Sequence, residues 1–453
     1  MLFCGVDIGT TNLKVCVVDR FGRSQWTRSV PTPRRAAAER LAADGRAIIT
    51  SVEDLVIEGW RAIGGGKPFA AISTTGVGED GLYVDEALEP LSWAIPWFDR
   101  SAAAEAAFIR ESPEATTRSG VEMDHTRTGA RWLWFRKHEP ETVARARYWI
   151  ALTDYPAVAW SSCPFISESL AGRTGCYDIE RRDWLDGLLK VCGAAAMPPV
   201  LRASDVVGPV RGRRLLESGA AGPETVVVAG GHDHPVAASY IQRFDPTARV
   251  DSIGTANVVY GETRDMKLDH FDPFLAFMVP VRADAGTACL GVFEFSAAVQ
   301  SLIDQGVDIR SFLALSRMPG APNASGEVRT AAIGAAAPRA VFETASLTAR
   351  RMMDRMSDVG VPKGAIFATG GWSRSRSLLE LRASVFGQSI NILSEQEPGV
   401  VGAALLAAEG IGEVVDLSGT ISIETMEPDE DWAVIYDDLF RQQFNSTPDR
   451  AGA

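Results

Sequence analysis

The stretch Val6-Asp7-Ile8-Gly9-Thr10-Thr11-Asn12 is written a second time, with small changes, as Val250-Asp251-Ser252-Ile253-Gly254-Thr255-Ala256-Asn257. Each copy is an apolar strand that runs into Gly-Thr-x-Asn and out into a second apolar strand. Glycine lets the backbone turn tightly and approach a ligand closely, so two such tips can present N–H groups and hydroxyls to one anion. We interpret them as two phosphate-binding hairpins in two related halves, with a nucleotide in a cleft between them.

A single Gly-Thr turn more often only reverses the chain, and this reading stays open for each copy taken alone. The pairing at half-chain spacing favours the phosphate interpretation. Asp7 directly precedes the first tip, where a phosphate-bound magnesium ion needs an oxygen ligand, direct or through water.

The bulk composition bounds the class of protein. A chain of 453 residues suits two domains, and we place them at 1–224 and 225–453, before a second apolar strand. The net charge of -13 argues against nucleic acid or an anionic membrane as partner. No apolar run reaches about 18 residues, no signal peptide precedes the first strand, and the six cysteines form no Cys-x-x-Cys pair. These features predict a cytoplasmic protein with reduced thiols and leave a homodimer open.

Strand and helix patterns alternate through the first half. We expect a helix over about 36–60, then a buried strand over 69–73 that leads into a glycine-rich stretch containing Glu79 and Asp80. This order predicts an α/β protein with mixed sheets covered by helices. Two adjacent carboxylates at a strand end can accept hydrogen bonds from vicinal hydroxyls of a substrate, although a solvated pair of loop acids is the alternative.

Asp233 follows another apolar strand within Gly230-Gly231-His232-Asp233-His234-Pro235. A carboxylate at such a strand end can accept a proton from a substrate hydroxyl, or it can simply cap the helix that Pro235 begins. On an extended segment His232 and His234 would point to the face opposite Asp233, so a zinc site is a weak alternative.

A later strand, over 366–369, ends in Gly370-Gly371-Trp372-Ser373 and enters a helix. Small residues at a helix start allow a purine to lie against the backbone, so we expect the nucleotide base here. A helix rich in glycine and alanine starts near Glu397, and we expect it to pack closely on a neighbour, for which the nucleotide-binding helix is one candidate.

Together these residues resemble the FGGY carbohydrate kinases of the actin-like ATPase superfamily, over nearly the whole chain. The landmarks, in order, are Asp7-x-Gly9-Thr10-Thr11-x-x-Lys14, Trp97-Phe98-Asp99, Asp154-Tyr155, Tyr177-Asp178, Asp183-Trp184, Gly254-Thr255 and Gly370-Gly371-Trp372-Ser373.

The resemblance implies two actin-like (ribonuclease H-like) domains with a nucleotide and substrate cleft between them. It implies ATP and Mg2+ as cofactors, a small sugar, ketose or polyol as substrate, and closure of the domains over MgATP. Asp233 matches the family's catalytic base; Asp7 and Asp233 would hold magnesium, directly or through water. The implied phosphate and nucleotide contacts are Asp7, Gly9, Thr10, Thr11, Lys14, Gly254, Thr255, Gly370, Gly371, Trp372 and Ser373, and the implied substrate contacts are Glu79, Asp80, Trp97, Asp99 and Asp233.

Several positions depart from the family pattern. Gly78-Glu79-Asp80 stands where many ketose kinases have Gln-Met-His, and it lacks the arginine of the glycerol kinase-like Gln-Arg-Glu. Trp372 stands where the family usually has a glycine, so it could stack on the purine or block it. Ser384 stands where an aspartate is common, and Arg100 directly follows Asp99, whereas the family more often has this arginine one residue later. A second class therefore stays open, namely a nucleotide sensor or chaperone-like ATPase of the same superfamily, whereas a zinc-containing repressor-related kinase is disfavoured because no Cys/His cluster has metal spacing.

Overall fold

The computed structural model describes residues 1–37, 40–254, 256–265, 272, 274–282, 286–315, 318, 336–395, 397–417 and 420–444. The chain forms two compact units. The first comprises Met1–Tyr240, Phe277–Thr287 and Glu397–Thr420, and the second comprises Ile241–Ala276, Ala288–Gln396 and Ile421–Ala453.

The expected boundary at 224/225 is wrong. The strand β14 (Val226–His232), which we expected to open the second domain, pairs in parallel with β6 (Ala71–Gly76) of the first unit, with Val226 opposite Ala71. Strand pairing of this kind joins a segment to a sheet whatever its position in the chain, so β14 belongs to the first unit.

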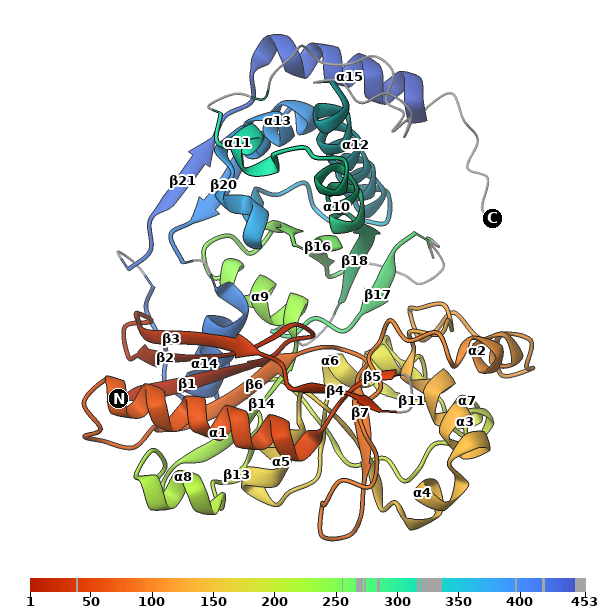
Figure 1. Cartoon of the computed structure of the whole chain (residues 1–453), viewed down its shortest axis with the longest axis vertical. Coiled ribbons are helices and arrows are strands. Elements are labelled where there is room, and N and C mark those ends of the chain that lie inside the picture. The colour runs from red at the N-terminus through yellow and green to blue at the C-terminus, as the bar shows by residue number, and fades with distance from the viewer. Residues whose placement is uncertain are drawn as a thin grey trace. The chain divides into compact units, whose positions relative to one another are not determined.

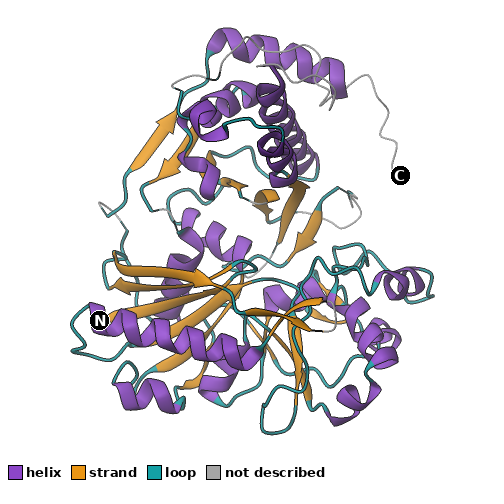
Figure 2. Ribbon diagram, viewed as in Figure 1, coloured by secondary structure: helices purple, strands orange, loops and turns teal. Residues whose placement is uncertain are grey.

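A six-stranded mixed sheet forms the centre of the first unit, in the order β13-β14-β6-β1-β2-β3 (Figures 1 and 2). The pairs β14–β6 and β6–β1 are parallel, and the other three pairs are antiparallel. The remaining strands of this sheet are β1 (Leu2–Ile8), β2 (Asn12–Asp19), β3 (Ser24–Pro31) and β13 (Val206–Pro209).

Two helices cover opposite faces of this sheet. Cys4 of β1 pairs with Val17 of β2, and Val17 lies beside Gly59 of α1 (Gly45–Ala62), so this face meets α1. Neighbouring strand residues point to opposite faces, which places Gly5 against the other helix, α14 (Pro398–Gly410). A Cβ on Gly5 would lie 2.0 Å from the carbonyl oxygen of Val400, so only glycine allows this approach.

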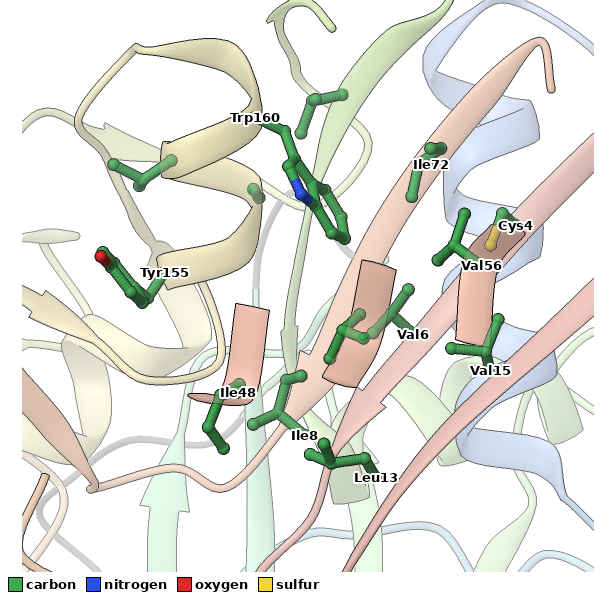
Figure 3. Close-up of a cluster of buried hydrophobic side chains, with 14 of the residues drawn as sticks. Cys4, Val6, Ile8, Leu13, Val15, Ile48, Val56, Ile72, Tyr155 and Trp160 are labelled. Atoms are coloured by element: carbon green, nitrogen blue, oxygen red, sulfur yellow. The ribbon is translucent and has the colours of Figure 1, made fainter. Parts of the chain in front are cut away.

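Apolar side chains from the sheet and from two helices fill the space on the α1 side (Figure 3). Cys4, Val6 and Ile8 of β1 lie in one buried cluster with Ile48 and Val56 of α1. Tyr155 and Trp160 add the second helix, α5 (Tyr155–Ser161). This cluster holds the carboxyl ends of β1 and β6 in fixed positions.

The helix expected over about 36–60 begins later than predicted. Its expected first turns are instead a short hairpin of β4 (Arg34–Ala37) and β5 (Arg40–Ala43). Asp44 then accepts a hydrogen bond from the backbone N–H of Arg46 and caps α1. An aspartate cap of this kind is a strong helix start signal, and the prediction overlooked it.

The rest of the first unit is a set of short elements that carry the polar residues discussed below. The strands are β7 (Gly81–Val84), β8 (Tyr148–Ala151), β9 (Ile166–Ser167), β10 (Tyr177–Asp178), β11 (Asp183–Trp184) and β12 (Val200–Leu201). The helices are α2 (Ala103–Arg110), α3 (Thr128–His138), α4 (Pro140–Arg145), α6 (Glu168–Ala171), η1 (Gly172–Thr174), α7 (Asp186–Cys192), α8 (Arg213–Ser218) and α9 (Asp233–Ile241).

The second unit is built on a seven-stranded mixed sheet in the order β17-β18-β16-β15-β19-β20-β21. Its strands are β15 (Arg249–Ile253), β16 (Ala256–Thr263), β17 (Ala276–Met278), β18 (Thr287–Glu294), β19 (Ile366–Thr369), β20 (Ile390–Leu393) and β21 (Ile423–Met426). Its helices are α10 (Ser296–Asp304), α11 (Ile309–Leu313), α12 (Ala336–Asp358), η3 (Gly371–Arg374), α13 (Arg376–Phe386) and α15 (Glu430–Phe444). The repeated sequence forms the first hairpin of each unit, β1–β2 in the first and β15–β16 in the second. The first strand of each hairpin also pairs with a parallel strand, β1 with β6 and β15 with β19.

None of the helices in the described part of the chain combines the length and the apolar character that a membrane crossing requires.

Candidate active site

The first Gly-Thr tip closes the hairpin of β1 and β2, as predicted. Ile8 is opposite Leu13, and the Gly9 N–H donates to the Asn12 carbonyl at 3.0 Å across the turn. A Cβ on Gly9 would lie 2.6 Å from that carbonyl oxygen, which explains the glycine. Thr11 is exposed at the tip, where its hydroxyl can meet a ligand.

Asp7 and Lys14 are cross-strand partners at the base of this hairpin. Lys14 Nζ lies 2.5 Å from Glu397 Oε2, at the residue that precedes α14. Burial raises the pKa of Asp7 to about 7; Lys14 opposes this, while Asp233 and Glu397 add to it. Asp7 Oδ1 is buried and has no hydrogen-bond partner in the described structure. The Asp7 carboxyl group therefore has an oxygen that could bind a cation.

Asp233 stands where β14 gives way to α9, and its Oδ1 accepts the His234 N–H at 2.7 Å. This bond links neighbouring residues at the start of α9 and is not the helix cap of the alternative interpretation. The expectation that both histidines face away from Asp233 is wrong, because Asp233 begins a helix instead of continuing an extended strand. His232 Nε2 lies 3.2 Å from Asp233 Oδ1 and His234 Nε2 lies 3.8 Å from it. Burial lowers the pKa of His232 to about 3, so its ring is neutral.

Glu79 and Asp80 are buried, so the reading of a solvated pair is wrong. Glu79 Oε1 accepts from Arg127 Nη1 at 3.0 Å and also from Arg173, through Nε at 2.9 Å and through Nη2. Burial opposes ionisation of Glu79, but Arg173 and Arg127 outweigh it and hold its pKa below the usual range. Burial raises the pKa of Asp80 to about 6 against the opposing charges of Arg131 and Arg34.

Trp97 and Asp99 have different surroundings. Trp97 Nε1 donates to the Thr10 hydroxyl at 3.2 Å, so the structure brings Trp97 to the first tip. Asp99 Oδ1 accepts from the backbone and the hydroxyl of Ser101, the former at 2.8 Å. Asp99 also contributes to the electrostatic environment of Arg131, whereas Arg100 is exposed.

The nucleotide residues expected in the second half lie in the second unit. Gly254 N–H donates to the Ala256 carbonyl at 3.1 Å, two residues on, whereas the bond of the first tip spans three residues; Thr255 lies outside the described residues. Gly370 has a φ of +85°, which favours glycine, and the Ser373 hydroxyl donates to its carbonyl at 2.7 Å. The segment 370–373 thus forms the predicted strand-to-helix junction, as η3 before α13.

Two departures from the family pattern have structural explanations in this unit. Trp372 is partly exposed and packs edge-on against Phe295 and Phe342, with ring centroids 5.6 Å and 6.0 Å away. The Ser384 hydroxyl donates to the Glu380 carbonyl and accepts the Asp429 N–H at 3.0 Å, so it joins α13 to the segment before α15.

The residues present fit magnesium bound with a nucleotide better than a dedicated metal cage. Among the described residues, no group of three or more His, Cys, Asp or Glu side chains is arranged to hold an ion. Magnesium keeps several waters and takes one or two carboxylates together with substrate phosphates. The buried, unpartnered Asp7 Oδ1 is suited to such a role.

Sequence reasoning missed five residues that shape this region, and they are Arg34, Arg127, Arg131, Arg173 and Glu397. Each belongs to a segment that reads as ordinary polar helix or loop, and charged residues of this kind are usually exposed. Gly78 lies where these residues meet, because a Cβ there would lie 2.9 Å from His232 Nε2 and 3.1 Å from Arg173 Cγ. That crowding would explain the glycine but does not show in the sequence.

A two-domain α/β fold with paired Gly-Thr hairpins and a buried acid beside one of them is the arrangement of sugar kinases. The N-terminal domain model of the FGGY family of carbohydrate kinases matches residues 2–239, and the C-terminal domain model matches residues 253–410. The chain belongs to this family, whose members are phosphotransferases.

Similar proteins agree with this assignment. A xylulose kinase from Lactococcus lactis is 24% identical over 452 residues, covering 90% of this chain and 87% of its own. The structure of a xylulose kinase from Rhodospirillum rubrum superposes with a TM-score of 0.86 at 20% identity, over 98% of this chain and 97% of its own. That of a gluconate kinase from Lactobacillus acidophilus gives 0.84 at 20% identity, over 98% of each chain. At these identities the two structures confirm the fold, and the sensor alternative is not favoured.

Proposed function

We propose that the protein transfers the γ-phosphoryl group of ATP to a primary hydroxyl of a small sugar, ketose or polyol, with Asp233 as general base. The observation that carries this proposal is the register of the first sheet, in which His232 is opposite Gly76 and Gly76 is opposite Ile8, so Asp233 and the first hairpin tip follow strands that end at the same edge. A base for the acceptor hydroxyl and a site for phosphate and cation are therefore neighbours within one unit.

In this reaction Asp233 accepts the proton as the substrate oxygen forms a bond to the γ-phosphorus. The bond from that phosphorus to the bridging oxygen breaks, and ADP leaves. Magnesium, when bound, offsets charge on the phosphate oxygens, and Asp7 and Asp233 would hold it directly or through water. Lys14 supplies a positive charge beside the same phosphates; although burial opposes it, Asp7, Glu397 and Asp233 raise the pKa of Lys14.

The remaining contacts complete the proposal. Thr10, Thr11 and the N–H groups near Gly9 take the phosphates from one side, and Gly254 and Thr255 take them in the second unit. Gly370, Gly371, Trp372 and Ser373 take the adenosine, and Glu79, Asp80, Trp97 and Asp99 surround the sugar. Closure of the two units over MgATP would exclude water and limit ATP hydrolysis.

The test is release of ADP from MgATP against three- to seven-carbon polyols, ketoses, aldoses and sugar acids. We expect turnover with one compound, and a loss of at least about a thousandfold in kcat for Asp233→Asn with ATP and sugar affinities nearly unchanged. Asp304→Asn, at an exposed carboxylate of α10, is the matched control and should behave as wild type. Unchanged turnover in Asp233→Asn would remove Asp233 as the base.

A further inference from the structure

The buried surroundings of Glu79 and Asp80 contain more positive than negative charge. Four guanidinium groups contribute to it, and they belong to Arg34, Arg127, Arg131 and Arg173. The side chains of Arg34, Arg127 and Arg173 are only 8%, 11% and 7% exposed, and Arg131 as a residue is 5% exposed. Among the described residues, Glu79 and Asp80 are the buried carboxylates that face these four cations.

Other carboxylates nearby are less able to balance the charge. Asp124 Oδ1 lies 3.7 Å from Arg127 Nε, but its side chain is 38% exposed, so water screens it. Asp99 is partly exposed and is already hydrogen-bonded to Ser101. Arg131 donates to the backbone carbonyls of Glu79 and Thr126, each at 3.0 Å, and Asp80 is the carboxylate that contributes most to its electrostatic environment. An unpaired buried cation is costly, so an excess of this kind is expected where a ligand brings the missing anion.

Specific donors in the cluster are also unused. Arg173 directs its Nε and Nη2 to Glu79, while its Nη1 is buried without a hydrogen-bond partner in the described structure. Arg127 Nε and both terminal nitrogens of Arg34 also lack a hydrogen bond in the described structure, but Arg127 Nε lies 3.7 Å from Asp124 Oδ1 and Arg34 Nη2 lies 3.5 Å from Asp80 Oδ2, so Arg173 Nη1 is the donor on which the inference rests. Arginine presents its donors as a planar fork that matches a carboxylate, so the free Nη1 of Arg173 is suited to a second carboxylate beside Glu79.

These donors lie near the proposed base. The Cβ position of Gly78 would be within 3.1 Å of Arg173 Cγ and 2.9 Å of His232 Nε2, so Arg173 and His232 converge on the same glycine. His232 Nε2 is in turn 3.2 Å from Asp233 Oδ1. A small molecule that reaches Asp233 with one end can therefore present another group to Arg173 and Arg127.

We propose that the substrate is a short polyhydroxy acid of about four to six carbons, whose carboxylate binds Arg173 and Arg127 while its terminal hydroxymethyl group meets Asp233. Phosphorylation of this acid rests on the proposed function, whereas binding of the acid to the arginines does not. One added carboxylate offsets part of the buried positive charge. A phosphate ester is the alternative anion for the same arginine donors, and the titration below separates it from the carboxylate.

The test is calorimetric titration of the full chain, without ATP, with aldonates of four to six carbons and with the alditol and the sugar phosphate of equal carbon number. We expect at least one aldonate to bind at least about thirtyfold more tightly than its alditol, as for a charge-assisted pair. Arg173→Gln should abolish that preference and Arg173→Lys should keep part of it. Arg118→Gln, at a partly exposed arginine paired with Asp178, should leave it unchanged.

Each other outcome has a defined meaning. Equal or tighter binding of the alditols, tightest binding of a sugar phosphate, or an aldonate preference that survives in Arg173→Gln would overturn the inference. If Arg173→Gln does not fold, as judged by its ATP affinity and thermal melt, Arg127→Lys with the same ligands takes its place, and there the preference should fall. Tight aldonate binding without ADP release would refute the proposed phosphoryl transfer and leave the anion site standing.

Discussion

His232 Nε2 lies 3.2 Å from Oδ1 of the neighbouring Asp233, and burial keeps this imidazole neutral by lowering its pKa to about 3. A neutral ring that donates from Nε2 can orient the Asp233 carboxylate without supplying a charge. We expect this contact to hold the Asp233 carboxylate in one direction, which its proposed role as base requires.

This arrangement predicts acid sensitivity that depends on His232. The folded pKa of His232 lies below the ordinary value of 6.5, so between about pH 6.5 and pH 3 the unfolded chain binds a proton that the folded protein does not. The free energy of unfolding is therefore highest above about pH 6.5 and decreases as the pH falls towards 3. From pH 7 to pH 5 the wild type should lose about 2 kcal/mol of unfolding free energy through this group. Urea titrations should show that His232→Asn loses less over the same range, whereas His138→Asn, at an exposed ring on α3, should follow the wild type. Parallel losses in His232→Asn and wild type would contradict the neutral ring.

Asp7 predicts a change of the opposite sign. Its folded pKa is raised from 3.8 to about 7, so ionisation destabilises the free protein as the pH rises between about 4 and 7. Asp7→Asn should melt several degrees higher than wild type at pH 8 and at nearly the same temperature at pH 4. The same variant should lose MgATP-dependent turnover, because it lacks the charge. If Asp7→Asn is no more stable than wild type at pH 8, burial of the ionised Asp7 carboxylate does not destabilise the protein.

Gly5 offers a test of how α14 meets the sheet. A Cβ at this position would lie 2.0 Å from the Val400 carbonyl oxygen and 2.8 Å from the Ala404 nitrogen, both rigid backbone atoms. We expect Gly5→Ala to cost about 2 to 4 kcal/mol in chemical denaturation. Gly66→Ala is the matched control, since nothing lies within 4 Å of its Cβ position, and it should be nearly neutral. A harmless Gly5→Ala would mean that α14 is not seated as described.

Trp372 predicts an effect on nucleotide affinity. Its edge-on contacts with Phe295 and Phe342 hold the ring in one orientation, and the side chain is partly exposed. Stacking on a base is worth about 1 to 3 kcal/mol, so Trp372→Ala should raise the KM for ATP about tenfold or more while the KM of the sugar stays unchanged. Trp93→Ala, at an exposed tryptophan of the first unit, should leave both constants unchanged. A lower KM for ATP in Trp372→Ala would instead mean that the ring blocks the purine.

Sequence patterns were sufficient for features that depend on local backbone geometry. The two Gly-Thr tips and the Gly370 junction were predicted because tight turns restrict which residues can occupy them. The resemblance built on those motifs gave the family, which the family models confirm. The catalytic and binding roles assigned to individual residues stay predictions.

Long-range packing could not be predicted in the same way. The glycines and alanines of α14 indicated close packing, and the structure shows that its partners include β1, β6 and α9, where a Cβ on Gly402 would lie 2.6 Å from the Val236 carbonyl oxygen. The arginines around Glu79 belong to separate segments near Arg127 and Arg173, and nothing local shows that they meet one acid. The domain boundary was wrong for the same reason, since pairing of β14 with β6 is a tertiary event.

The position of α14 has a consequence for how the protein is made. The first unit starts with β1 at Leu2 but lacks the cover for one face of that strand until Pro398–Gly410 has been synthesised. At ribosomal speeds of about 5 to 20 residues per second, the stretch between Tyr240 and α14 takes on the order of ten seconds or more. During that interval the nascent chain exposes an apolar sheet face, which makes it a natural client for chaperones. The same reasoning makes residues 1–240 a poor choice for expression as a separate fragment.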